Sequence, residues 1–164
     1  MSVRVTGAEI RDRLAGVHEN IEAALERSGR TDERVRVLVA TKYYGPEQLS
    51  ALAEAGVDLV GENRAEDLLD KQELFGDSFE WHFIGHLQRR KAKVVVPRVT
   101  LVHSVDSVRL TGELAKRAPE GGVDILIQVN VADEESKYGV AEEDVGTLLK
   151  AAAETTGRVR VRGL

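Results

Sequence analysis

The sequence predicts an α/β fold of the (β/α)8 TIM-barrel type, in an incomplete form with six of the eight strands and an N-terminal helix. Six short apolar runs recur along the chain with helical stretches between them, as in a parallel sheet. No G-x-G-x-x-G turn follows the first run, where residues 41–45 read Thr-Lys-Tyr-Tyr-Gly, and this disfavours a doubly wound sheet. A complete barrel typically takes about 250 residues, whereas this chain has 164. We therefore expect a single barrel domain over residues 1–164, with the C-terminal strands missing.

The first predicted element is a helix that begins near Thr6. Thr6 and Glu9 are three residues apart, which is the spacing of a capping box. Apolar residues then recur on one helical face: Ile10, Leu14, Val17, Ile21 and Leu25. The sequence therefore predicts an amphipathic opening helix.

The strands and the remaining helices alternate after it. The predicted strands are 37–40, 57–60, 81–84, 99–103, 125–129 and 159–161. Pro46 marks the start of one helix and Gly56 its end, following the preference for proline at helix starts and glycine past helix ends. A later helix has an apolar face at Val145, Leu148, Leu149 and Ala152, and Gly157 closes it.

Composition narrows the class of protein. The chain carries 28 acidic and 23 basic residues, a net charge of −5, which argues against a general binder of nucleic acid or anionic membranes. It has no cysteine, so disulfides and thiolate metal sites are excluded. No apolar run approaches about 18 residues and the start lacks a signal-peptide core. We expect a cytoplasmic protein.

Lys42 is the first residue with distinctive chemistry. It follows the apolar run 37–40 at the point where a parallel strand opens into its loop, the end at which α/β barrels keep their active sites. A lysine that is partly desolvated there can act as an amine nucleophile toward a carbonyl or an aldehyde cofactor. The alternative is a solvated surface lysine that happens to follow a strand.

Asn63 closes the second strand in the run Gly61-Glu62-Asn63. Its amide can project toward a ligand at the mouth of the barrel. It can also cap the helix that begins near Arg64, because asparagine is a favoured capping residue. The two roles are compatible.

The segment 81–88, Trp-His-Phe-Ile-Gly-His-Leu-Gln, concentrates unusual residues where the third strand meets its loop. Trp81 and Phe83 are expected to pack in the core, and Gly85 permits either a close backbone approach or a positive φ. His82 and His86 are four apart, which on a helix would suggest a metal pair. Here the spacing crosses a strand and a glycine, and no third acidic ligand accompanies them, so we expect no metal site.

The fourth predicted strand leads into His103-Ser104-Val105-Asp106-Ser107. Ser104 or His103 can contact a ligand, and Asp106 or Ser107 is expected to cap the next helix. A Ser-His-Asp hydrolase is disfavoured, because the residues are adjacent and no G-x-S-x-G elbow is present.

Two further segments complete the set. Gln128-Val129-Asn130 ends the fifth predicted strand. The polar loop after it contains Lys137, the second candidate amine, which is expected to be solvated. The basic cluster at residues 89–93 is expected to form a solvated helix face, since no aromatic residues interleave with its charges as in single-strand binders.

Taken in order, these segments resemble the pyridoxal-phosphate homeostasis protein family, which has the barrel of the alanine racemase N-terminal domain. The resemblance covers the chain from about Val37 to its end, and the leading helix suits it. The matching segments are Val39-Ala40-Thr41-Lys42, Gly61-Glu62-Asn63, residues 81–88, residues 103–107, Gln128-Val129-Asn130, Glu135-Ser136-Lys137 with Gly139, and Arg162-Gly163-Leu164.

The resemblance implies a carrier or regulator of pyridoxal 5′-phosphate (PLP) with no known catalytic activity. The family's Schiff-base lysine falls on Lys42, and Asn63 is the best second residue at the cofactor. His82, Ser104 and Asn130 complete the expected cofactor-binding set. The partner is then a small molecule, and the family is monomeric, although open strand edges would allow self-association here.

Two departures from the family leave alternatives open. The family holds the cofactor phosphate with Ser, Gly and Thr groups near the last two strands, which this chain is expected to lack, and Tyr43-Tyr44 stand where many relatives carry Thr and Lys. One alternative is a PLP-dependent racemase-type enzyme, which would need a second acid/base group. In alanine racemases that group is a tyrosine from a separate domain. The other is a truncated module that no longer binds PLP.

Overall fold

The six strands of the computed structural model, which describes residues 5–132, 134 and 138–164, form one parallel sheet. They are β1 (Val39–Ala40), β2 (Leu59–Glu62), β3 (Glu80–Phe83), β4 (Leu101–Val105), β5 (Val123–Ile127) and β6 (Val159–Gly163). Each strand pairs with the next one in the sequence, in the order β1-β2-β3-β4-β5-β6. This sequential order is that of a (β/α) barrel and excludes a doubly wound sheet, which confirms the predicted fold class.

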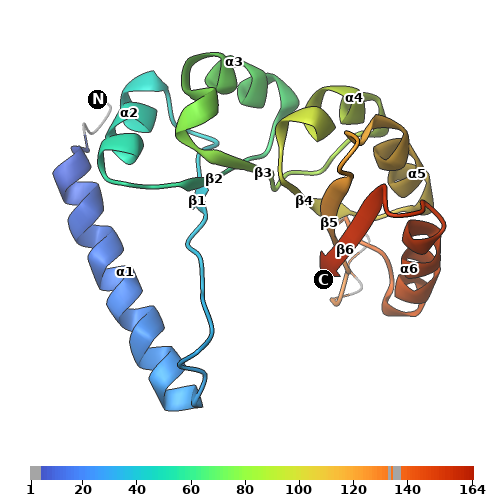
Figure 1. Cartoon of the computed structure of the whole chain (residues 1–164), viewed down its shortest axis with the longest axis horizontal. Helices are drawn as coiled ribbons and strands as arrows, with labels where there is room; N and C mark the ends of the chain where they lie inside the picture. The colour runs from blue at the N-terminus through green and yellow to red at the C-terminus, as the bar shows by residue number, and fades with distance from the viewer. Residues whose placement is uncertain (1–4, 133, 135–137) are drawn as a thin grey trace.

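The sheet is open within the described residues. There, β1 has β2 as its one neighbour and β6 has β5 as its one neighbour, and the two outer strands do not pair with each other. Figure 1 shows the resulting arc, with β1 and β6 toward its two ends.

Among the described residues, five of the six helices line the outside of this arc, and the first extends away from its N-terminal end (Figure 1). The helices are α1 (Gly7–Ser28), α2 (Pro46–Glu54), α3 (Ala65–Phe75), α4 (Ala92–Val95), α5 (Val108–Arg117) and α6 (Val145–Ala153). Short 3-10 turns accompany them: η1 (Gly76–Ser78), η2 (Arg89–Lys91), η3 (Val96–Arg98) and η4 (Glu142–Asp144). Each of α2 to α6 lies between two consecutive strands, as the βα repeat requires.

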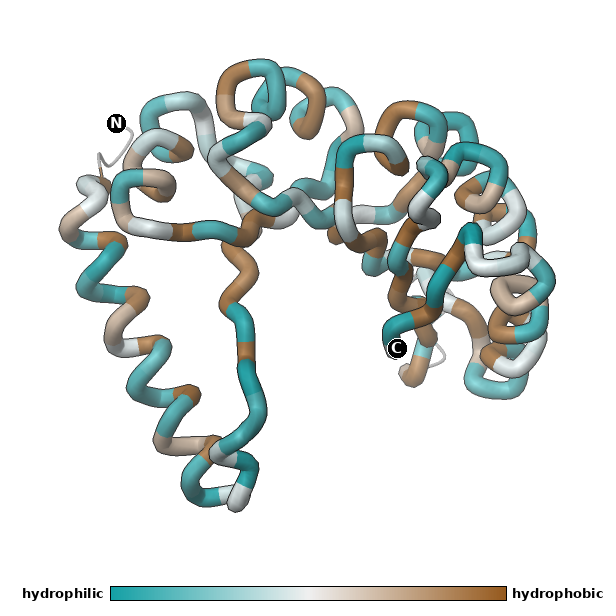
Figure 2. Tube along the Cα trace, viewed as in Figure 1, coloured by the Kyte–Doolittle hydropathy of each residue, from teal (hydrophilic) through white to brown (hydrophobic). Residues whose placement is uncertain are grey.

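The opening helix forms as predicted. The backbone N–H of Glu9 donates to Thr6 Oγ1 at 3.3 Å, and the N–H of Thr6 donates to Glu9 Oε2 at 2.8 Å, which completes the capping box. The helix ends at Gly29, whose φ of 67° is left-handed. Apolar and polar residues alternate in bands along α1 (Figure 2), and Ile10 and Leu14 pack against the core.

The core lies between the sheet and the helices. Trp81 and Phe83 are buried in it, as predicted, and their neighbours come from both layers. The largest of these neighbours with almost no exposure are Leu49, Val60, Leu68, Val95, Val96, Val102, Val105, Leu114 and Ile125. Burial of this apolar layer fixes which side of each strand faces the helices.

The strand boundaries differ from the prediction by up to two residues at each end. The first predicted strand, 37–40, is paired over Val39–Ala40, and the fifth, 125–129, starts earlier, at Val123. Strand ends depend on which backbone groups find a partner: the N–H of Val123 donates to Arg158 O at 2.9 Å, beyond the end of the apolar run. No helix among the described residues is long and apolar enough to cross a membrane.

Candidate functional site

β3 carries polar side chains on the inner face of the sheet. Glu80 and His82 alternate along β3 with the core residues Trp81 and Phe83, so they lie on the side away from the helices. Glu80 Oε2 accepts from Arg36 at 2.7 Å, and Oε1 accepts from the Thr100 hydroxyl at 2.9 Å. The hydrogen bond from Arg36 lowers the pKa of Glu80 to about 2, so this carboxylate is ionised at neutral pH.

His82 and His103 form a hydrogen-bonded pair beside Glu80. His82 Nδ1 lies 3.0 Å from His103 Nε2, and His82 Nε2 lies 3.2 Å from Glu80 Oε1. An ionised carboxylate can only accept, so His82 carries its proton on Nε2 and accepts at Nδ1 from the Nε2–H of His103. Burial lowers the pKa of both imidazoles, which favours the neutral forms that this arrangement needs.

This pairing bears on the prediction that His82 contacts a ligand. Both of its ring nitrogens have protein partners and the side chain is buried, so His82 has no free nitrogen to offer. Its partner His103 lines a cavity of about 590 Å³ that also includes Leu126, Gln128 and Val145. The sequence named His103 and Ser104 as alternatives but contained no sign that the two histidines would meet, since 21 residues separate them.

Lys42 follows β1 at the carboxyl end of the sheet, where the sequence predicts it. The N–H of Tyr44 donates to Thr41 O at 2.8 Å, and this turn carries Lys42 and Tyr43 out of the sheet. Of the two alternatives that the sequence left open for Lys42, a partly desolvated amine and a solvated one, the structure shows the solvated one, because the turn leaves Lys42 exposed. Its ammonium lies over the ring of Tyr43, 4.9 Å from the centroid.

A buried cluster lies directly behind Lys42. Glu62 has no exposed surface, and its Oε1 accepts from the Thr41 hydroxyl at 2.6 Å and from the ammonium of Lys71. Lys71 also donates to the backbone oxygen of Thr41 at 2.7 Å. The sequence analysis missed Lys71 and the role of Glu62. A charged residue within the apolar run 59–62 was the one available signal.

Asn63 follows β2 and does not cap α3. The capping position is held by Arg64, without a side-chain bond, so the proposed capping role is wrong. Asn63 Oδ1 is instead buried, with no hydrogen-bond partner among the described residues. The backbone of Asn63 lies against Gly85, where a Cβ would meet Asn63 O at 2.2 Å. Gly85 thus serves a close approach between two loops of the protein, and it is not among the glycines with positive φ.

The side chains of Ser104 and Asn130 differ in whether they have hydrogen-bond partners. Ser104 lies within β4 and is 3% exposed, and its Oγ has no partner in the described part of the chain. Asn130 lies beyond β5, where its Nδ2 donates to Glu134 O at 3.0 Å. The next helix is capped by Ser107, which accepts from the N–H of Leu110 at 3.3 Å.

His86 lies in the loop after β3, away from His82. Its ring stacks on Tyr138, with centroids 3.6 Å apart, and its Nδ1 lies 3.5 Å from Asp106 Oδ2. No group of three metal-ligating side chains occurs among residues 5–132, 134 and 138–164. The second candidate amine, Lys137, lies outside the described residues.

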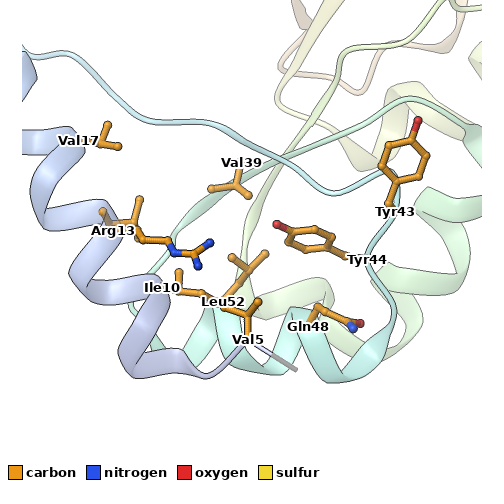
Figure 3. Close-up of a pocket in the computed structure, with 10 residues that line it drawn as sticks. Val5, Ile10, Arg13, Val17, Val39, Tyr43, Tyr44, Gln48 and Leu52 are labelled. Atoms are coloured by element: carbon orange, nitrogen blue, oxygen red, sulfur yellow. The ribbon is translucent and has the colours of Figure 1, made fainter. Parts of the chain in front are cut away.

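Two cavities lie at the carboxyl ends of the strands. The one of about 590 Å³ borders His103, and a second of about 260 Å³ is lined by Asn63, Phe83, His86 and Arg90. A third, of about 330 Å³, lies on the other side of β1, where Tyr44 points toward Arg13 and Val39 (Figure 3). This third cavity belongs to the packing of α1 on the outer layer, because Val39, Leu14 and Leu52 line it.

The site therefore combines an accessible amine with buried hydrogen-bonding atoms that lack partners. A buried polar atom without a partner costs free energy, about 1–3 kcal/mol, and such atoms in a native fold call for an explanation. Asn63 Oδ1 needs a donor, and Ser104 Oγ can donate or accept. A hydrogen-bond donor on a small ligand would satisfy Asn63 Oδ1, and either a donor or an acceptor would satisfy Ser104 Oγ.

The sequence of this chain is similar to those of known proteins. No protein-family model matches the chain. The pyridoxal phosphate homeostasis protein of Aquifex aeolicus (strain VF5) is 40% identical over 156 residues, which cover 93% of this chain and 68% of that protein. The protein of the same name from Escherichia coli (strain K12) is 35% identical over 162 residues, covering 95% and 69%.

Solved structures show the same similarity. A protein of unknown function from Bifidobacterium adolescentis matches with a TM-score of 0.84 and 31% identity, over 100% of this chain and 70% of that one. PipY of Synechococcus elongatus PCC7942, solved with PLP bound, matches with a TM-score of 0.77 and 26% identity, over 94% of this chain and 68% of that one. The same protein without PLP matches with a TM-score of 0.79.

Proposed function

Because the chain belongs to the pyridoxal phosphate homeostasis protein family, we propose that it binds PLP, holds it as a Schiff base on Lys42, and acts in PLP homeostasis without catalysing a reaction. The observation that carries the proposal is the pair of buried polar atoms at Asn63 and Ser104 that lack partners among the described residues. Asn63 directly follows β2, the neighbour of β1, and Ser104 lies in β4, two strands further along the sheet. Membership of the family and the PLP-bound relative support it.

The residues present fit this cofactor. PLP supplies an aldehyde that reacts with an amine, together with ring substituents and a phosphate that form hydrogen bonds. Lys42 would hold the cofactor through its amine, which has to be deprotonated to react with the aldehyde that PLP would supply. The exposed position of Lys42 admits the reactant without a conformational change.

The other residues orient the ligand. Asn63 Oδ1 accepts from a donor on it, Ser104 Oγ takes the second hydrogen bond, and Asn130 borders the same end of the sheet. His82 acts through His103, whose position it holds from the inner face.

Borohydride reduction tests the assignment of Lys42. After incubation with PLP, reduction and peptide mass spectrometry should find the phosphopyridoxyl group on Lys42, and Lys42→Ala should abolish it. Lys93→Ala, which removes an exposed lysine of α4, is the matched control and should leave the adduct unchanged. An adduct chiefly on Lys137, or one spread evenly over surface lysines, would refute the proposal.

Alanine substitution tests the other contacts. Asn63→Ala and Ser104→Ala should each weaken PLP retention by up to about tenfold, the effect of one hydrogen bond worth about 0.5–1.5 kcal/mol. Retention that is unchanged in both variants would show that these atoms do not face the cofactor.

The two alternatives have distinct signatures. A racemase-type enzyme would convert L-alanine at a rate in the common range of about 1–1000 per second, measurable as loss of optical rotation. A module that no longer binds PLP would give no cofactor absorbance after mixing and desalting. We expect the cofactor absorbance and no racemisation.

A further inference from the structure

We propose that Glu62 is a positioning residue that holds Lys42 in place relative to Asn63, with Lys71 and Thr41 completing its cluster. The inference rests on the proposed function of Lys42 and Asn63. It adds three residues that touch neither the ligand nor the reacting atoms.

The burial of Glu62 is the first observation. A carboxylate is almost never fully buried unless it is paired, because removing it from water is costly. Glu62 has no exposed surface, and the side chain of Lys71, its ion-pair partner from α3, is 12% exposed. The pair lies on the helix side of the sheet, behind the strand ends.

The contacts of Glu62 reach both proposed site residues through their backbone. Its Oε1 accepts from the Thr41 hydroxyl at 2.6 Å, and its Oε2 accepts from the N–H of Asn63 at 3.2 Å. One carboxylate thus joins the residue before Lys42 to the peptide unit of Asn63.

Lys71 closes the connection from the other side. Besides its bond to Glu62, its ammonium donates to Thr41 O at 2.7 Å, and that oxygen belongs to the peptide bond between Thr41 and Lys42. Two charged groups therefore fix the peptide unit from which Lys42 projects.

Apart from Glu62 and Lys71, this peptide is held by the N–H of Tyr44, which donates to Thr41 O at 2.8 Å, and by the end of β1. β1 has two residues, and beyond it the N–H of Thr41 donates to Gly61 O at 3.0 Å before the chain turns outward. A buried ion pair contributes little net stability compared with apolar residues of the same size. The ion pair instead fixes the position of this peptide, because the backbone hydrogen bonds between β1 and β2 end at Thr41, one residue before Lys42.

The test separates positioning from stability. The double variant Glu62→Gln/Lys71→Met removes both charges and leaves no unpaired buried ion. Arg30→Met/Glu33→Gln, which removes an ion pair of exposed residues beyond α1, is the matched control. We expect the first variant to unfold cooperatively but to form the borohydride-trapped adduct on Lys42 about tenfold more slowly, the effect of losing one charge-assisted hydrogen bond. The control should match the parent chain, and Lys71→Arg, which keeps a donor cation, should recover most of the rate.

A milder variant covers the case in which the double variant does not fold. Thr41→Val keeps the shape and β-branching of the side chain but removes the hydroxyl that Glu62 binds. It should slow the adduct severalfold in a chain that still unfolds cooperatively. A folded double variant, or Thr41→Val, that reacts at the rate of the parent chain would overturn the proposal.

Hydrogen exchange gives a readout that needs no cofactor. The amides of Asn63 and Tyr44 are bonded to Glu62 Oε2 and Thr41 O. Both should exchange about tenfold faster in the double variant or in Thr41→Val, and at the parent rate in the control pair. If the parent chain forms no adduct on Lys42, the proposed function fails and this exchange still decides the positioning. Unchanged exchange would refute it.

Discussion

Gly85→Ala tests the packing of the site directly. The Cβ of alanine would lie 2.2 Å from Asn63 O, 2.6 Å from Asn63 Cα and 2.7 Å from Asn63 C, whereas real Cβ atoms essentially never come closer than 3.0 Å. All three contacts are with backbone, so no side-chain rotation relieves them. The backbone around Asn63 is itself held, because the N–H of Ile84 donates to Glu62 O at 2.8 Å.

The expected loss in the free energy of unfolding follows from the rigidity of this backbone. Overpacking a well-packed site costs about 1–3 kcal/mol, and the clash with hydrogen-bonded backbone places Gly85→Ala near 3 kcal/mol. Backbone strain does not add to it, since Gly85 is not among the glycines with positive φ. The displacement of Asn63 should also reduce PLP retention.

Urea unfolding followed by the fluorescence of Trp81, the single tryptophan, measures the free energy of unfolding. The matched control is Gly112→Ala in α5, where a Cβ meets nothing within 4 Å. That substitution should stabilise the chain by about 0.5–1 kcal/mol, because alanine is the better helix former. If the free energy of unfolding of Gly85→Ala differs from that of the parent chain by less than about 0.5 kcal/mol, below the range for overpacking, the predicted clash with Asn63 is wrong.

Three further predictions concern protonation and assembly. Burial lowers the pKa of His82 and His103 from the ordinary value of 6.5, so below pH 6.5 the unfolded chain binds more protons and the free energy of unfolding should fall as the pH drops. His103→Gln keeps a donor for His82 and should flatten this slope. An unchanged slope would contradict the assignment. Glu80, whose pKa is lowered to about 2 from 4.5 chiefly by Arg36, should add a second loss of stability between those pH values, absent in Arg36→Met. The unpaired edges of β1 and β6 should make the 164-residue chain associate as it is concentrated, and a light-scattering mass that stays monomeric from micromolar to millimolar protein would exclude this.

Sequence alone determined the elements and their order. The capping box at Thr6, the proline at residue 46 and the alternation of apolar runs are local patterns, readable without knowing what lies across the sheet. Because parallel strands place their carboxyl ends at one edge, the same patterns also put Lys42 and Asn63 at a common end of the fold.

Tertiary structure decided how those residues are held. The pairing of Glu62 with Thr41 spans 21 residues, and the pairing of His82 with His103 also spans 21, so both depend on strand register that no local pattern encodes. The exposure of Lys42 likewise follows from the turn after β1. Within the described part of the chain, the Asn63 amide oxygen lacks a partner because Arg64, and not Asn63, holds the capping position and because Gly85 packs against the Asn63 backbone. Periodicity is a property of neighbouring residues, whereas burial and hydrogen-bond partners are properties of the packed whole.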